Sequence, residues 1–189
     1  IGPGSICTTR MVAGIGVPQI SAVMEVKKAL NKKKIKIISD GGIKFSGDIA
    51  KALAAGADAI MMGSIFAGTD ESPGKKFKVK GKIYKHYRGM GSIGAMSSGS
   101  ANRYFQKNYK DKSKFVPEGV EGRVEYKGSV SKIIYQLQGG LKSSMGYIGA
   151  KNLGEIKSQA KFIKITKAGF YESMVHSVEM TQKTMNYKL

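Results

Sequence analysis

The sequence predicts an α/β protein built from consecutive parallel βαβ units. Amphipathic helical segments alternate with short apolar segments, and the apolar segments end in glycine and polar residues. The chain has 189 residues, which suits one ordinary domain with its own core. In such folds the residues that carry function gather where the strands end.

The segment 17–62 has the clearest helical and strand periodicity. The expected elements are, in order, a helix over 17–34, a buried strand over 35–39, a helix over 46–57 and a buried strand over about 58–62. The buried face of the first helix is expected to comprise Ile20, Val23, Met24 and Leu30. Ser46 is the expected N-cap of the second helix, with Asp48 in its first turn.

The segment 71–128 has little sustained periodicity and is rich in Gly, Ser, Lys and Tyr. A loop of this length is either functional or disordered. A hairpin that leads into a glycine-rich turn is expected over 78–96. The elements expected after this segment are a helix over 129–145, a helix-like piece over 147–156, a strand over 161–166 and a polar tail.

The net charge of +19 raises the question of a polyanionic partner. Only four of the 32 basic residues are arginines, and the lysines are spread from Lys27 to Lys188. A solvated surface explains dispersed lysines better than a nucleic-acid-binding stripe does. No segment approaches the roughly 18 apolar residues of a membrane span, and no signal-peptide pattern is present. We therefore expect no membrane partner and disfavour a nucleic-acid partner.

Cys7 is the only cysteine, and it lies in a glycine-rich loop over 1–16. A structural cysteine is usually buried in an apolar element. Glycines let backbone amides converge on a bound group, and a cation such as Arg10 favours the thiolate. A reactive thiol and an incidental loop cysteine both remain open on these features. A single cysteine excludes a disulfide framework and indicates a reducing cytoplasm.

Polar residues follow both expected strands. Asp40, before Gly41 and Gly42, suits the hydroxyls of a ribose, while Gly63 and Ser64 offer N–H groups and a hydroxyl to a phosphate. Taken singly, each of these residues is better explained as part of a turn.

Taken together, these segments resemble the C-terminal half of inosine-5′-monophosphate (IMP) dehydrogenases. The resemblance runs in order through almost the whole chain and rests on "GPGSICTTR", "GVPQ", "SDGGIKFSGDIAKALAAGAD", "MMGSIFAGTDESPG", "YRGMGSIGAM", "NRYF" and "PEGVEGRV". It implies the C-terminal half of a TIM (β/α)8 barrel with a mobile active-site flap inserted at about 93–127. About three βα units are present, too few to close such a barrel, so the chain is expected to be a fragment without the N-terminal half-barrel and the regulatory modules.

The resemblance implies NAD-dependent oxidation of IMP to XMP, a step of guanine nucleotide biosynthesis. Cys7 would add to carbon 2 of the purine and form a covalent thioimidate. Arg103 and Tyr104 of the flap would activate the water that hydrolyses it. Thr9 would lie near this chemistry, and Glu118 would touch the purine edge.

The same resemblance implies the substrate contacts. Ser5, Gly63 and Ser64 would hold the phosphate, and Asp40 the ribose, with Gly41 and Gly42 close to the ligand. A turn would add further backbone donors from Tyr87, Arg88, Gly89, Met90 and Gly91.

A potassium ion is also implied, bound by backbone carbonyls in a homotetramer. The implied donors are Gly2, Gly4 and Cys7 of one subunit and Glu172, Ser173 and Met174 of its neighbour, the latter in a C-terminal segment at about 167–189. Gly2 would also contact NAD, although most dinucleotide contacts of the family lie in the absent half. His86 and His176 have no partner at metal-ligand spacing, so zinc is not expected.

Three alternatives stay open beside the dehydrogenase. GMP reductase, a sister enzyme that uses NADPH, shares the opening motif, but the resemblance implies that it lacks the flap carrying "NRYF" and "PEGVEGRV". A basic nucleic-acid-binding module would bind with steep salt dependence. A catalytically dead fragment would merely expose half a core.

Overall fold

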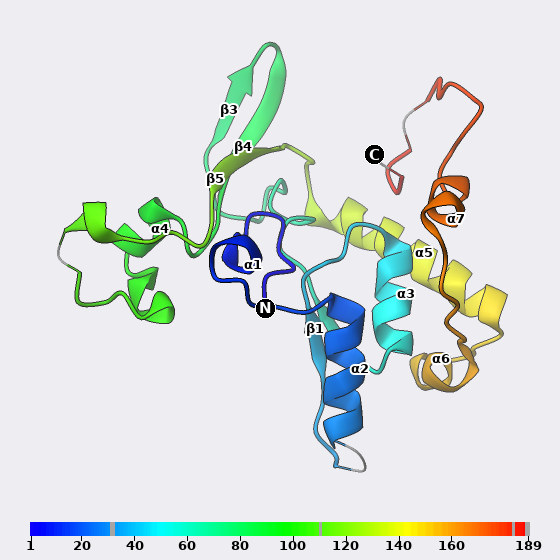
Figure 1. The fold of residues 1–189 in the computed structure, drawn as a ribbon. Coiled ribbons are helices and arrows are strands. Elements are labelled where there is room, and N and C mark those ends of the chain that lie inside the picture. Colours follow the sequence, from blue (N-terminus) through cyan, green and yellow to red (C-terminus); the bar gives the residue numbers. More distant parts are fainter. Residues whose placement is uncertain (31–32, 110, 183, 188–189) are drawn as a thin grey trace.

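The computed structural model describes residues 1–30, 33–109, 111–182 and 184–187 (Figure 1). The remaining positions belong to the expected helix over 17–34, the flap and the C-terminal segment, and these parts of the three predictions lie outside the described residues. The elements, in chain order, are α1 (Thr9–Val12), α2 (Gln19–Leu30), β1 (Ile38–Asp40), α3 (Ser46–Ala54), β2 (Ala59–Met61), β3 (Lys76–Val79), β4 (Lys82–Arg88), α4 (Ile93–Ser97), η1 (Ser100–Tyr104), η2 (Lys112–Lys114), β5 (Glu121–Glu125), α5 (Val130–Ile148), α6 (Leu153–Gln159) and α7 (Lys167–Glu172).

Strands β1 and β2 form the expected parallel pair, with Ile38 opposite Ala59 and Asp40 opposite Met61. Within the described residues these two strands pair only with each other. The expectation that both strands are buried is therefore wrong for their outer faces, since Ile38 is 64% and Met61 57% exposed. Parallel strands are ordinarily covered on both faces. In this pair one face is uncovered, and it presents apolar side chains such as Ile38 and Met61.

Helices α3, α5 and α6 lie together (Figure 1) and build the main core, against which Ile60 of β2 also packs. Its buried members include Leu53 of α3 and Ile156 of α6, and Leu137 of α5 packs against them. A second cluster joins Val23 of α2 to Ala55 and Ala57, the latter completely buried. The expected helix over 17–34 thus buries Val23, whereas Met24 is 45% exposed.

The start of α3 differs from the expectation, because Phe45 rather than Ser46 is the N-cap residue. The Asp48 carboxylate accepts hydrogen bonds from the backbone N–H groups of Lys44 and Phe45, both at 3.0 Å. A carboxylate in the first turn satisfies free N–H groups and complements the helix dipole. It therefore supplies the cap that was expected from the serine hydroxyl.

The expected helical piece over 147–156 is divided in the structure. Helix α5 continues to Ile148 and ends at Gly149, which adopts a left-handed conformation with φ 77°. Helix α6 then starts after Asn152, whose side chain accepts a hydrogen bond from Glu155 N.

The segment 71–128 holds an antiparallel sheet in the order β3–β4–β5. The expected hairpin is present, with Val79 opposite Lys82, and it projects from the body in Figure 1. Its turn uses Lys80 and Gly81 with φ values of 47° and 80°, as a two-residue hairpin turn requires. Strand β5 was not expected; it pairs with β4 so that Arg88 lies opposite Glu121.

Gln106, between η1 and η2, closes a smaller loop within this segment. Its side-chain amide donates to Val116 O at 2.9 Å and its side-chain oxygen accepts from Val116 N at 2.8 Å. This side chain is buried and substitutes for a strand partner.

The strand expected over 161–166 is wrong, because no described strand pairs with it. An apolar segment without a hydrogen-bonding partner does not form a strand. Its residue Ile163 is 83% exposed. The tail is not wholly irregular either, since α7 follows Thr166, whose hydroxyl accepts from Gly169 N. None of the helices in the described part of the chain is long and apolar enough to cross a bilayer.

Candidate active site

Three backbone segments, 6–8, 89–92 and 118–120, meet at the carboxyl end of β4. Val120 N donates to Ile6 O at 3.0 Å, and Gly89 N donates to Val120 O at 2.9 Å. Thr8 N donates to Glu118 O at 2.9 Å. The segment 118–120 is therefore joined by main-chain hydrogen bonds to the cysteine loop on one side and to the segment 89–92 on the other.

Glycines allow this close approach. A Cβ at position 91 would lie 2.8 Å from the Tyr104 ring and 3.0 Å from the Glu118 carbonyl carbon. A Cβ at position 89 would lie 3.1 Å from Ile6 O. Contacts this short exclude a side chain at position 91 and crowd one at position 89, which explains the Gly-Met-Gly spacing of the turn.

Cys7, Thr9 and Glu118 form a chain of side-chain contacts. The Cys7 Sγ lies 3.2 Å from Thr9 Oγ1, and Thr9 Oγ1 donates to Glu118 Oε2 at 2.8 Å. Since the threonine hydroxyl has one proton and gives it to the carboxylate, the thiol is the donor in the first contact. The arrangement connects the half-buried thiol to a carboxylate through one hydroxyl, a geometry in which a proton leaving the sulfur has an acceptor.

A cavity of about 630 Å³ opens beside this chain. Of the residues singled out from the sequence, those that line it are Gly2, Gly4, Ser5, Cys7, Asp40, Gly41, Gly63, Ser64, Tyr87, Arg88, Gly89, Met90, Gly91, Tyr104 and Glu118. Those that do not line it are Thr9, Gly42, Arg103, Glu172, Ser173 and Met174. Thr9 still reaches the site through its contact with the thiol.

One end of the cavity lies where β1, β2 and β4 finish. Gly41 N donates to Met61 O at 3.0 Å, so Asp40 and the turn at Gly63 are held at the same sheet edge. The hydroxyl of Tyr87 approaches Gly63 closely, at 3.3 Å from the position of a Cβ there. This end therefore gathers a carboxylate, hydroxyls and the backbone of two glycine-containing turns, groups of the kind that bind a sugar phosphate.

Tyr104 of η1 lines the other end of the cavity, whereas its neighbour Arg103 does not. Burial raises the pKa of the Tyr104 phenol above its ordinary value, and negative charge on Cys7 and Glu118 raises it further, while the neighbouring Arg103 lowers it. The phenol therefore stays protonated beside the thiol and the carboxylate. Arg103 itself is exposed.

The C-terminal segment lies away from the cysteine loop. Figure 1 shows α7 beyond α5, on the far side of α3 from α1. The structure therefore does not bring Glu172, Ser173 and Met174 to the loop of the same chain. Among the described residues, no three His, Cys, Asp or Glu side chains are grouped to hold a metal ion.

Gln19 of the site was not singled out from the sequence, and Arg10 was considered only as a cation near the thiol. Gln19 lines the cavity and donates to Asp40 O at 2.8 Å, and the segment "GVPQ" was its only signal. Arg10 fastens the cysteine loop by donating to Ile1 O at 3.0 Å and Val17 O at 2.5 Å. These contacts join residues seven and nine positions apart within a loop, which no periodic pattern reveals.

The chain is similar to known proteins over almost its whole length. The family model "IMP dehydrogenase / GMP reductase domain" matches residues 1–176. Inosine-5′-monophosphate dehydrogenase of Chlorobaculum parvum is 58% identical over 99% of this chain and 38% of its own length. The enzyme of the same name from Cryptosporidium parvum is 55% identical over 99% of this chain and 46% of its own length.

A solved structure is also similar. GMP reductase from Trypanosoma brucei, a cysteine-to-alanine variant in complex with guanosine 5′-monophosphate, superposes with a TM-score of 0.84 and 46% identity. It covers 95% of this chain and 36% of the reductase chain. The chain thus spans about two fifths of the length of the relatives it matches. On the family match and these identities, the chain belongs to the IMP dehydrogenase / GMP reductase family.

Proposed function

We propose that this chain supplies the nucleophile, most of the nucleotide site and the flap of an NAD-dependent IMP dehydrogenase, which oxidises IMP to XMP for guanine nucleotide synthesis. The observation that carries the proposal is the thiol of Cys7, linked through Thr9 to Glu118 on the edge of a cavity with sugar-phosphate donors at its other end. The names of the most similar curated relatives point to the same activity.

The oxidation begins at the thiol. Cys7 loses its proton, for which Glu118 is the acceptor through Thr9, and the thiolate adds to carbon 2 of the hypoxanthine ring. The hydrogen on carbon 2 then leaves as hydride, and the covalent thioimidate remains. NAD, when bound, supplies the hydride acceptor.

Hydrolysis completes the reaction. Water attacks carbon 2, the carbon–sulfur bond breaks, and Cys7 and XMP are released. Arg103 and Tyr104 are the groups proposed to activate this water. An arginine has a pKa above about 12, so it acts only through a site that favours its neutral form or through the transition state.

The substrate is held from both ends. Ser5, Ser64 and the backbone N–H of Gly63 are proposed to bind the phosphate with the turn at 87–91. Asp40 is proposed to accept from the ribose hydroxyls, while Gly42 supports it. Glu118 is proposed to accept from a purine N–H.

The residues present fit the two implied cofactors in part. The potassium donors are all backbone carbonyls, the oxygen ligands that replace the hydration shell of a potassium ion. Glu172, Ser173 and Met174 stand at the end of α7, where carbonyls lack helical partners, although Met174 O already accepts from His176 at 2.8 Å. Gly2 lies in the cavity wall and would face NAD.

The wider assembly is part of the proposal. The exposed apolar face of β1 and β2 supports an N-terminal half-barrel as its covering, in keeping with a TIM barrel whose flap spans about 93–127. The separation of α7 from the cysteine loop supports a homotetramer in which a neighbour completes the ion site. A cytoplasmic location accords with the single cysteine.

GMP reductase is the second candidate, favoured by the solved structure. That reductase is 46% identical and covers 95% of the chain. The dehydrogenases cover 99%, so the covered share of the chain does not distinguish reductase from dehydrogenase activity. The dehydrogenases at 55–58% identity make oxidation of IMP the better-supported reaction.

The deciding experiment gives the purified full-length protein IMP, NAD and potassium and follows NADH by absorbance. NADH formation supports the proposal. Absence of NADH, together with NADPH-dependent consumption of GMP, would replace it with the reductase.

A further inference from the structure

Lys85 of β4 is buried although it is charged. It is 2% exposed, and among the described residues it is the one charged side chain in the buried set. A buried ammonium costs free energy unless its protons are bonded. Its partners are main-chain oxygens, since Nζ donates to Thr69 O at 2.6 Å and to Ser72 O at 2.5 Å.

These carbonyls belong to a turn that continues from the Gly63–Ser64 turn. Phe66 N and Ala67 N donate to Gly63 O at 3.0 and 3.1 Å, and Thr69 N donates to Phe66 O at 3.0 Å. A compact chain of hydrogen bonds thus connects the phosphate end of the cavity to the carbonyls that Lys85 binds.

Lys85 is also related to the cavity along its own strand, through Tyr87, which lines the cavity. Side chains two apart in a strand lie on one face, so Lys85 and Tyr87 share a face of β4. The Tyr87 hydroxyl approaches Gly63, and Lys85 binds the turn beyond it. Strand β4 therefore meets the segment 63–72 at two places, through Tyr87 at Gly63 and through Lys85 at Thr69 and Ser72.

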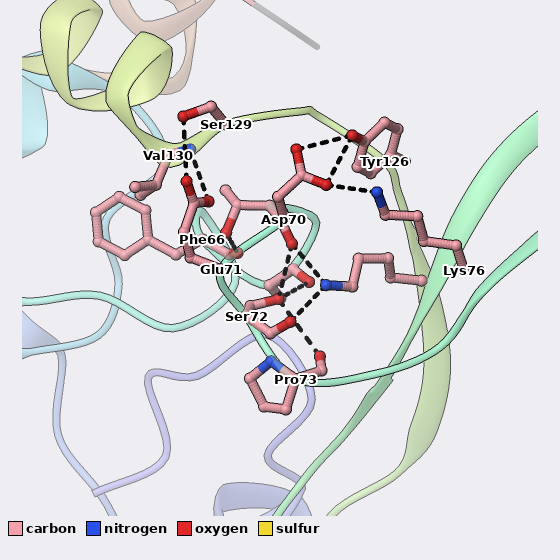
Figure 2. A network of polar contacts seen from close by, with 12 residues as sticks. Phe66, Asp70, Glu71, Ser72, Pro73, Lys76, Tyr126, Ser129 and Val130 are labelled. Atoms are coloured by element: carbon pink, nitrogen blue, oxygen red, sulfur yellow. Dashed lines mark hydrogen bonds and ion pairs between the residues drawn. The ribbon is translucent and has the colours of Figure 1, made fainter.

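No apolar cluster of the described residues fixes the distance between β4 and the segment 66–72. The two core clusters contain no described residue between Phe66 and Gly128. Instead, the turn is held by polar contacts on its outer side (Figure 2): Asp70 accepts from Tyr126 and pairs with Lys76, and Glu71 accepts from Ser129 and from Val130 N. Lys85 is the buried lysine of this network, whereas Lys76 is exposed.

We propose that Lys85 is a positioning residue that sets the distance between the Gly63–Ser64 turn and the carboxyl end of β4, and so determines affinity for the phosphate group of the nucleotide. The inference rests on the proposed function only for the identity of that nucleotide. It assigns no chemical step to the ammonium.

The test compares Lys85→Met with wild type in the full-length protein. Binding of IMP and of inosine, which lacks the phosphate, is measured by calorimetry without NAD, and KM and kcat for IMP are measured with NAD. The Lys85→Met protein is expected to bind IMP about tenfold more weakly, because one phosphate contact is misplaced, while inosine affinity and kcat change less than threefold. The matched control is Lys76→Met, which removes an exposed lysine of the same network and is expected to leave all four constants within twofold.

Equal weakening of IMP and inosine, or an unchanged IMP affinity, would overturn the inference. Should Lys85→Met fail to fold, the losses of affinity for IMP and for inosine are compared in Lys85→Arg instead. The larger guanidinium displaces the same carbonyls while keeping the charge. Wild-type protein that binds IMP yet forms no NADH would refute the proposed function and leave this binding test intact.

Discussion

The two parts of the molecule that border the cavity are stabilised differently. The parallel part, made of β1, β2 and helices α2, α3, α5 and α6, contains two apolar clusters in which Ala57 and Ile156 are fully buried. The part over 66–128 relies on an antiparallel ladder and on polar contacts such as those of Gln106. Segments with few buried apolar contacts open at lower free energy, so the chemistry that requires motion is expected in the second part.

The difference separates stability from activity. Substitutions in the two apolar clusters of the first part should lower the free energy of unfolding and leave the kinetics of the folded protein unaltered. Substitution of a catalytic residue in the second part should change the kinetics and leave the free energy of unfolding nearly unaltered.

Cys7→Ala, at the junction of the two parts, should have the largest effect. Turnover of IMP is expected to fall at least about 10³-fold, because the covalent route disappears. IMP binding should remain detectable by calorimetry, since the phosphate and ribose contacts are untouched. Residual turnover within about tenfold of wild type would refute the role of Cys7.

Ile156→Ala tests the apolar part. Removing this fully buried side chain should lower the free energy of unfolding by about 3 kcal/mol, measured by urea denaturation, with KM for IMP unchanged. Ile163→Ala is the matched control, because Ile163 is largely exposed and should cost less than about 0.5 kcal/mol. A change in KM for IMP in Ile156→Ala without a loss of stability would contradict the assignment of stability to the apolar part.

Arg103→Ala tests the polar part. Steady-state turnover should fall about 10²-fold, as expected for loss of a group that activates water. Stopped-flow absorbance should still show a first-turnover burst of NADH, because hydride transfer precedes hydrolysis in the proposed mechanism. Arg123→Ala removes an arginine of β5 that lies over the ring of Tyr84 in β4, and it should leave the steady state near wild type. Loss of the burst in Arg103→Ala would point to a structural role instead.

Asp58→Asn should have the smallest effect, a change in how the free energy of unfolding depends on pH. The hydrogen bond from Lys157, then that from Ile37 N, lowers the pKa of Asp58 from 3.8 to about 2. A lowered pKa stabilises the fold above the unfolded value, and this contribution disappears as pH falls from about 4 to about 2. Asp58→Asn should therefore cost about 1 kcal/mol at pH 7, after allowance for solvent screening, and nothing near pH 2.

Urea denaturation at several pH values measures this loss. Glu179→Gln removes an exposed carboxylate and serves as the control. Parallel stability curves for wild type and Asp58→Asn would show that the ion pair does not contribute.

Much of the fold could be predicted because local patterns specify it. Helices α2, α3 and α5 and strands β1 and β2 occur where periodicity indicated them. The predictions failed where tertiary partners decide. Residues 161–166 have strand-like composition without a strand partner among the described residues. Strand β5 has three charged residues among its five, yet it forms because β4 provides a partner.

The site shows the same limit. Residue types alone left Cys7 undecided and made Asp40 and Ser64 weak candidates, and the family resemblance supplied the rest. The structure places most of these residues around one cavity. The hydrogen bond between Thr9 and Glu118 joins positions 109 residues apart, which no spacing rule predicts. The roles of the lining residues remain predictions for the experiments above.

The amide of Gln106 has a practical consequence. Because this one side chain pairs with both main-chain groups of Val116, the chain between them begins and ends at a fixed pair of points, whatever its length. Closing a longer loop costs little additional entropy. Extra residues inserted after Asn108 should therefore be accommodated, and a genetically encoded fluorescent amino acid placed there would report the position of this segment during turnover.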